Sequence, residues 1–175
     1  MLLRIAVGQT DWIAIDKNGK IKFSTQTRGM NPQVLSSSII SERIVNNFDL
    51  YHNRDSIKKI FFYGAGCGVT SSVNRILKVF KSIFKNSDFD IKEDTYAAVY
   101  STIKLGEKSI VCILGTGSNC SYYDGKDIEQ RIISLGYTLM DEASGNFFGK
   151  ELIRSYYFNE MGLDIAKDFE KEYDL

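Results

Sequence analysis

Hydrophobic and polar positions follow two different periods along this chain, and together they predict an architecture that mixes strands with helices. Segments that are apolar throughout or alternate with polar residues are typical of β-strands; they lie at 2–7, 12–15, 20–25, 58–64, 89–92, 109–114 and 120–123. Apolar residues that recur every three or four positions predict helices. These helices cover 36–48, 69–84, 93–103 and 163–173, and a further one ends at about 157. Three strands in succession, followed by strands separated by helices, indicate the α/β class with a mixed sheet.

The second and third of these strands should form a hairpin. They are joined by Asp16-Lys17-Asn18-Gly19, which ends in the Asn-Gly pair that tight hairpin turns favour. Both residues of such a pair tolerate positive φ, so the turn matches the twist of its strands.

Charge and composition exclude several classes of function. Lys and Arg number 22 among the 175 residues, and so do Asp and Glu, so no global field favours nucleic acid or an acidic membrane surface. No apolar run reaches membrane-spanning length, and the N-terminal residues do not follow a secretion-signal pattern. We therefore expect a cytoplasmic protein that binds neither nucleic acid nor membrane.

The cysteines and the single histidine do not predict a metal site. Cys67, Cys112 and Cys120 form no CxxC pair and lack zinc-ligand spacing, so they are interpreted as reduced thiols. Cys112 lies within an apolar strand, where it is expected to act as a small buried hydrophobe. His52 lies in a polar connector and is expected to be a solvated loop residue.

The stretch Gly115-Thr116-Gly117-Ser118-Asn119 follows an apolar strand and carries small hydroxyl and amide residues. Backbone N–H groups freed by the two glycines can converge on an anion, while the side chains can hold a phosphate or a sugar hydroxyl. A plain glycine-rich hairpin explains the same residues equally well.

Two further segments carry candidate chemistry. Asp94 follows a predicted strand and starts a helix, so it is either a helix N-cap or a base that accepts a proton from a substrate hydroxyl. Asp141 and Glu142 precede small residues, which suits a cap for one carboxylate and a polyol or magnesium-phosphate contact for the pair. The glycines of "YGAGCG" (63–68) lack the spacing of dinucleotide-binding loops and are interpreted as strand–helix packing.

Several of these motifs, in this order, resemble the BadF/BadG/BcrA/BcrD-type ATPases, and especially their N-acetylglucosamine kinase members. The matching segments are "QTDW" (9–12), "GMNP" (29–32), "FYGAGC" (62–67), "EDTYAA" (93–98), "CILGTGSN" (112–119) and "SLGYTLMDEASG" (134–145). The resemblance implies an actin-like, Hsp70-like sugar-kinase fold. Residues 1–175 would be a single ribonuclease-H-like lobe with a mixed five-stranded sheet, flanking helices and an extra β-hairpin.

The resemblance also implies an activity and roles for particular residues. The reaction is phosphoryl transfer from ATP, with magnesium, to the 6-hydroxyl of N-acetylglucosamine, and Asp94 is the general base. The residues implied for the sugar are Asn31, Gly117, Ser118, Asn119, Asp141 and Glu142. Those implied for phosphate are Gly8, Gln9, Thr10, Gly115 and Thr116.

This chain departs from the family pattern in two respects. The segment "AVGQTDW" lacks the acidic residue and about three positions of the family's first phosphate loop, although Asp11 is present. The resemblance also ends with the first lobe. It therefore implies a chain that is incomplete or inactive alone, and that self-associates or receives a second lobe from another chain.

Two other functions stay open at this point. A non-catalytic relative that senses a sugar or binds a protein partner would explain the shortened first loop. The family also contains iron–sulfur activator ATPases, but Cys67 and Cys120 lack an obvious cluster context.

Overall fold

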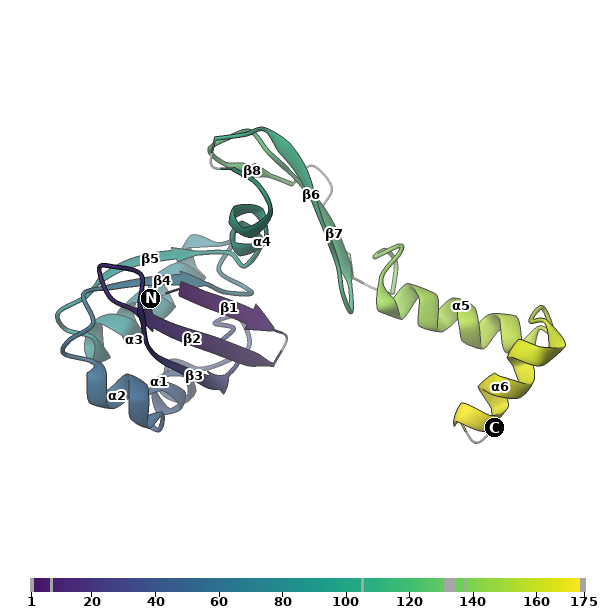
Figure 1. Ribbon diagram of the computed structural model, residues 1–175, viewed down its shortest axis with the longest axis horizontal. Helices are drawn as coiled ribbons and strands as arrows, with labels where there is room; N and C mark the ends of the chain where they lie inside the picture. Colours follow the sequence, from purple (N-terminus) through teal and green to yellow (C-terminus); the bar gives the residue numbers. More distant parts are fainter. Residues whose placement is uncertain (1, 7, 105, 131–134, 137, 174–175) are drawn as a thin grey trace. The chain divides into compact units, whose positions relative to one another are not determined.

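The computed structural model describes residues 2–6, 8–104, 106–130, 135–136 and 138–173 (Figure 1). They form two compact units, an N-terminal unit that ends at Ser101 and a C-terminal unit that begins at Thr102. The described residues contain no helix long and apolar enough to cross a membrane.

The N-terminal unit begins with the predicted antiparallel strands. Strands β1 (Leu2–Ala6), β2 (Gln9–Ile15) and β3 (Ile21–Arg28) pair in sequence order. The hairpin after β2 forms, but of the Asn18-Gly19 pair only Gly19 has a positive φ, +80°, and its N–H donates to the carbonyl of Asp16 over 3.0 Å. The Asp16 carboxylate also accepts from the N–H groups of Lys20 and Asn18, and these bonds lower its pKa.

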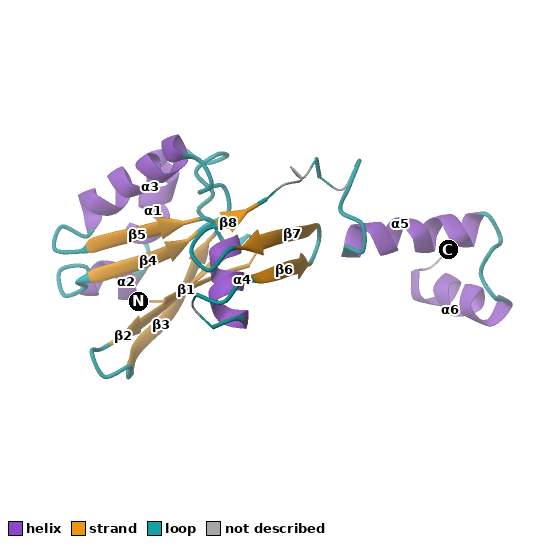
Figure 2. Cartoon of the chain, turned by 90° about the horizontal axis from the view of Figure 1, so that it is seen from above, coloured by secondary structure: helices purple, strands orange, loops and turns teal. Residues whose placement is uncertain are grey.

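A parallel pair of strands completes the sheets of this unit (Figure 2). Strand β4 (Lys59–Tyr63) and strand β5 (Asp88–Lys92) are connected through helix α3 (Thr70–Ile83). Strand β1 lies beside β4, but no hydrogen-bonded ladder joins them in the part of the chain that is described. The expected single five-stranded sheet is thus not confirmed in that form, because its strands group as three and two.

The predicted helix over 36–48 is wrong in one respect, because two helices replace it. Helix α1 (Ser37–Val45) ends before Asn47, which caps helix α2 (Phe48–Asn53) by accepting from the N–H of Leu50 over 3.0 Å. The Asn47 amide also donates to Thr25 Oγ1 and the Gln26 carbonyl on β3. This tertiary contact fixes the break, and it places His52 in α2, where it stacks on Phe48, instead of in a loop.

Large apolar side chains from β2, β4 and α3 form the core of the N-terminal unit. Trp12, Phe62 and Phe80 are almost completely buried, with ring centroids 5.2–6.4 Å apart in tilted and edge-on arrangements. Trp12 Nε1 donates to Thr27 Oγ1 over 3.0 Å, so its one polar group is satisfied inside this core. The core fixes the strand ends from which the candidate site projects.

Helix α4 (Thr95–Thr102) leads into the C-terminal unit. Strands β6 (Ser109–Leu114), β7 (Ser118–Tyr123) and β8 (Ile128–Glu129) form an antiparallel sheet, and helices α5 (Gly145–Tyr157) and α6 (Leu163–Tyr173) follow. Strands β6 and β7 form a hairpin around the glycine-rich residues 115–117.

The β6 strand differs from expectation in its burial. Val111 is buried, whereas its neighbours Ile110 and Cys112 are exposed. The prediction that Cys112 is a buried hydrophobe is therefore wrong: the side chains of an antiparallel strand alternate between faces, and Cys112 lies on the exposed one.

Candidate functional site

Asp94 lies between the end of β5 and the first turn of α4. Its carbonyl accepts from the N–H of Ala97 over 2.9 Å, as expected for a residue at a helix start. Its carboxyl group is half-buried, and burial raises its pKa even though hydrogen bonds from backbone N–H groups at Thr95 and Asp94 oppose the change. Asp94 thus stands at the start of α4 and carries a carboxyl group of raised pKa.

The loop after β4 contacts two sequence-distant segments of the N-terminal unit, one at Asn31 and one at Glu93. Gly66 has a φ of +79° and packs directly against the Asn31 carboxamide, so the space for a side chain at 66 is occupied. A Cβ at Gly68 would lie 3.0 Å from the Glu93 carboxylate. The glycines at 66 and 68 therefore allow Asn31 and Glu93 to lie close to the loop after β4.

Cys67 lies in this loop and interacts electrostatically with the carboxylates of Asp94 and Glu93. Burial raises the pKa of its thiol to about 12, and the nearby charges of Asp94 and Glu93 act in the same direction. The pKa of Glu93 is itself raised, by burial and by Asp94. Sequence reasoning missed Glu93 and assigned the glycines to packing alone, although the acidic pair Glu93-Asp94 was visible in the sequence.

Thr95 adds a second polar feature beside Asp94. Its hydroxyl is buried and has no hydrogen-bond partner among the residues that the structure describes. A buried hydroxyl normally pairs, because leaving it unpaired costs about 1–3 kcal/mol. Thr95 Oγ1 is therefore an unsatisfied buried polar atom next to Asp94 in the sequence.

The residues predicted for the first phosphate loop occupy a short connection. Ala6 pairs with Gln9, so only positions 7 and 8 separate β1 from β2. Gly8 has a φ of +89° and accepts a hydrogen bond from the N–H of Gly29. Gln9 is exposed at the start of β2, whereas Thr10 is buried within it.

In the C-terminal unit, residues 115–117 form the tip of the β6–β7 hairpin, and Ser118 and Asn119 begin β7. The N–H of Gly115 donates to the carbonyl of Gly117 over 2.9 Å. The first turn of α5 holds this tip: the N–H of Gly145 donates to Gly115 O over 2.8 Å, and Asn146 Nδ2 donates to Thr116 O over 2.7 Å. The amide of Asn119 accepts from the Ser121 hydroxyl.

The acidic pair before α5 divides between two environments. Asp141 is buried with a φ of +73°, and its carboxylate packs against Gly117, where a Cβ would lie 2.5 Å from Oδ2. Glu142 is exposed. Ser144 is the helix cap, since its hydroxyl accepts from the N–H of Phe147 over 3.1 Å. Asp141 is thus brought to the hairpin tip, while Glu142 is not.

No protein-family model matches the sequence, and no curated protein matches it significantly. A crystal structure from Porphyromonas gingivalis, described as a "Putative N-acetylglucosamine Kinase", matches with a TM-score of 0.80 and 31% sequence identity. The match covers 95% of this chain and 59% of that protein. An inorganic polyphosphate/ATP-glucomannokinase from Arthrobacter sp. strain KM matches with a TM-score of 0.52 and 17% identity, over 85% of this chain and 69% of that chain.

The fold is similar to that of sugar kinases. The chain spans less than two thirds of the length of the Porphyromonas gingivalis protein. The sugar-kinase fold agrees with the expected α/β class, and the expected resemblance to N-acetylglucosamine kinases agrees with this neighbour.

Sugar kinases that use ATP generally use magnesium with it. The described residues contain no group of three His, Cys, Asp or Glu side chains that could hold a metal ion. Asp11, the acidic residue retained from the first loop, accepts a hydrogen bond from Gln26 Nε2 over 2.5 Å on the face of β2 and β3. The described residues do not form a magnesium site by themselves.

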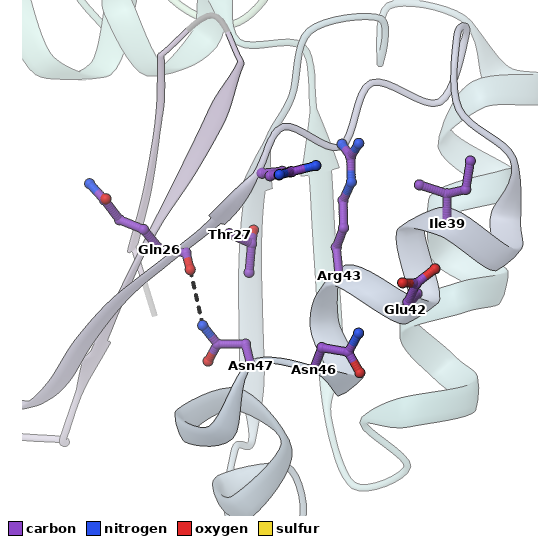
Figure 3. A pocket seen from close by; sticks show the side chains of 8 residues that line it. Gln26, Thr27, Ile39, Glu42, Arg43, Asn46 and Asn47 are labelled. Carbon is purple, nitrogen blue, oxygen red and sulfur yellow. Dashed lines mark hydrogen bonds between the residues drawn. The ribbon is translucent and has the colours of Figure 1, made fainter.

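A pocket of about 450 Å³ lies elsewhere in the N-terminal unit, between the end of β3 and helix α1 (Figure 3). The Arg43 guanidinium reaches the carbonyl of Gly29 from α1, and Asn47 bonds the Gln26 carbonyl over 3.0 Å. None of the predicted site residues lines this pocket. Its polar contacts attach α1 and α2 to β3 and thereby support the loop that carries Asn31.

The contact between Gly117 and Asp141 predicts the effect of a single methyl group. Gly117→Ala should lower the free energy of unfolding by about 1–3 kcal/mol, because the new Cβ would overlap the buried carboxylate. Adding Asp141→Ala should restore most of this loss, which a double-mutant cycle in urea measures. Gly149→Ala is the control, since nothing lies within 4 Å of a Cβ there. Equal losses with and without Asp141→Ala would contradict the contact.

Proposed function

We propose that this chain is the N-terminal, sugar-binding lobe of an ATP-dependent N-acetylhexosamine kinase of the BadF/BadG/BcrA/BcrD type. The lobe would be ribonuclease-H-like, and it would transfer phosphoryl groups only together with a second lobe. The observation that carries the proposal is the half-buried Asp94, with its raised pKa, beside the Gly66–Asn31 contact and Glu93. The match to the Porphyromonas gingivalis protein supports the same reaction class.

In this proposal Asp94 is the general base. Its carboxylate accepts the proton of the sugar 6-hydroxyl as that oxygen attacks the γ-phosphorus of ATP. A base works best when its pKa approaches the operating pH, and burial moves the pKa of Asp94 in that direction. The α4 backbone fixes the carboxylate, so little rearrangement is needed before the proton moves.

The other proposed contacts divide between the two units. Asn31, held against Gly66, presents its amide to the sugar. In the C-terminal unit, Gly117, Ser118, Asn119, Asp141 and Glu142 are proposed to contact the sugar. The proposed phosphate contacts are Gly8, Gln9, Thr10, Gly115 and Thr116. Catalysis then depends on positioning and on charge stabilisation more than on covalent chemistry.

A second candidate is a non-catalytic relative that binds a sugar as a signal. The observation that favours it is the Ala6–Gln9 pair, which leaves two positions where a longer phosphate loop would be needed. Such a protein would retain the sugar contacts and lose productive ATP binding.

Isothermal titration of the chain with N-acetylglucosamine, and separately with magnesium-ATP, tests the proposal. Sugar binding should be lost in Asp94→Ala and in Asn119→Ala. The exposed Asp55→Ala and Asn74→Ala are matched controls and should bind as the unmodified chain does. Sugar binding that survives Asp94→Ala would favour the sensing protein, and binding of neither ligand would contradict both candidates.

A further inference from the structure

Two of the three cysteines face one another across the β6–β7 hairpin. Cys112 and Cys120 are direct partners in the antiparallel register, and their sulfur atoms lie 3.2 Å apart. Both side chains are exposed, and both thiols are free. An oxidant in solution can therefore reach either sulfur, and each sulfur is already in contact with the other.

The backbone at this pair suits a disulfide. Hydrogen-bonded and non-hydrogen-bonded pairs alternate along an antiparallel ladder. Because Gly115 bonds to Gly117 at the hairpin tip, the alternation makes Cys112–Cys120 a non-hydrogen-bonded pair. Cα atoms of such pairs lie about 4.5 Å apart, within the range of about 4.4–6.8 Å that disulfides require.

Cys67 provides a contrast within the same chain. It is buried in the N-terminal unit, and its pKa of about 12 keeps it protonated at any physiological pH. The thiolate is the reactive form of cysteine, so Cys67 should resist oxidation. In the exposed pair, the hydrogen bond between the two thiols raises the pKa of Cys120.

We propose that Cys112 and Cys120 form a reversible redox site, which a hydroperoxide oxidises to a disulfide that locks the hairpin carrying the Gly-Thr-Gly-Ser-Asn loop. The Cys112 thiolate attacks the hydroperoxide, so that an S–O bond forms, the O–O bond breaks and a sulfenic acid results, while the alkoxide that leaves takes a proton from water and departs as an alcohol. Cys120 then attacks that sulfur: the S–S bond forms, the S–O bond breaks, and the thiol proton leaves with the hydroxide as water. Two electrons pass from the thiols to the peroxide, and a dithiol reductant reverses the change.

The disulfide would constrain the segment that the sugar-kinase proposal uses. Residues 113–119, which include the whole loop, lie between the two cysteines. The α5 contacts at Gly115 and Thr116 would then hold one side of a covalently closed ring. The redox site itself is independent of the proposed function, because it rests only on the sulfur geometry.

The test uses the whole chain with hydrogen peroxide, followed by alkylation in denaturant and mass spectrometry. Both cysteines fall in one tryptic peptide, 109–126, because no Lys or Arg separates Lys108 from Lys126. After oxidation this peptide should be lighter by two hydrogens and unlabelled, and the chain should take up one alkyl group instead of three. Dithiothreitol should restore all three.

Matched variants separate the expected result from other oxidation. Cys67→Ser should form the same light peptide at the same rate, independent of protein concentration. Cys112→Ser and Cys120→Ser should not form it. Uptake of oxygen atoms without loss of two hydrogens, disulfide-linked dimers on a non-reducing gel, or labelling of all three cysteines after peroxide would overturn the proposal. None of these readouts requires sugar or ATP, so failure of the kinase proposal would leave the result unaffected.

Discussion

Asp94→Asn should weaken binding of N-acetylglucosamine by roughly 10- to 100-fold while leaving the fold intact. Asparagine caps a helix about as well as aspartate, so α4 should keep its start. The substitution removes the charged acceptor for the sugar hydroxyl, and a hydrogen bond to a charged group contributes about 1.5–3 kcal/mol. Titration calorimetry of the variant beside the exposed Asp55→Asn measures the difference. Undiminished sugar affinity would remove Asp94 from the site.

The same substitution should change the pH dependence of stability. The folded-state pKa of Asp94 is raised above its ordinary value of 3.8, so the folded chain holds this proton more tightly than the unfolded chain. The resulting stabilisation is fully present below pH 3.8 and is lost as the pH rises through the folded-state pKa. Asp94→Asn should therefore be more stable than the unmodified chain at pH 7, and the difference should shrink towards pH 4.

Asp16 provides a control of opposite sign. Its pKa is lowered by the N–H groups of Lys20 and Asn18, so its contribution is present at neutral pH and is lost on acidification through the folded-state pKa. Urea unfolding at several pH values should give, for each variant, the difference in the free energy of unfolding from the unmodified chain. As the pH falls, this difference should change in opposite directions for Asp94→Asn and Asp16→Asn. Parallel changes would contradict the assignment of burial as the cause at Asp94.

Phe80→Ala should cost about 3–5 kcal/mol of stability, the largest loss that we expect from a single substitution in this chain. Phe80 is completely buried, and its ring lies 5.2 Å from the Phe62 ring and 6.0 Å from the Trp12 ring. Truncation removes these contacts and leaves a cavity that the surrounding sheet and helix cannot fill completely. Denaturant unfolding followed by circular dichroism gives the difference.

Phe48→Ala is the matched control for this experiment. Phe48 lies in the same unit, is 75% exposed and stacks on His52. Its removal should change the free energy of unfolding by no more than about 0.5 kcal/mol. Comparable losses in the two variants would mean that the aromatic cluster around Phe80 does not dominate the stability of the unit.

The order of strands and helices could be predicted because its signals are local. The Asn18-Gly19 turn and the amphipathic pattern of α3 each depend on residues close in sequence. The break between α1 and α2 could not be predicted, because Asn47 is held by Thr25 and Gln26 on a distant strand. The exposure of Cys112 depends in the same way on which face of β6 is covered, and the strand's own composition does not determine this.

The candidate site could be predicted only in part. The sequence indicated Asp94 as either a cap or a base, and the structure places it at the start of α4 with a carboxyl group of raised pKa. The approach of Asn31 to Gly66 and of Glu93 to Gly68 depends on packing between segments more than 20 residues apart, or on the exact path of a loop. No pattern within either segment reveals these distances. Resemblance to a family, more than spacing, supplied the proposed roles.

The contact between Gly66 and Asn31 has a consequence for how this loop can evolve. The two positions share one volume: the space that a methyl group would need at 66 is filled by the carboxamide at 31. The positive φ at 66 adds a second penalty for any side chain there. A lineage could therefore enlarge residue 66 only after shortening residue 31, and each single step would be disfavoured. The two positions are expected to change as a pair or to stay fixed.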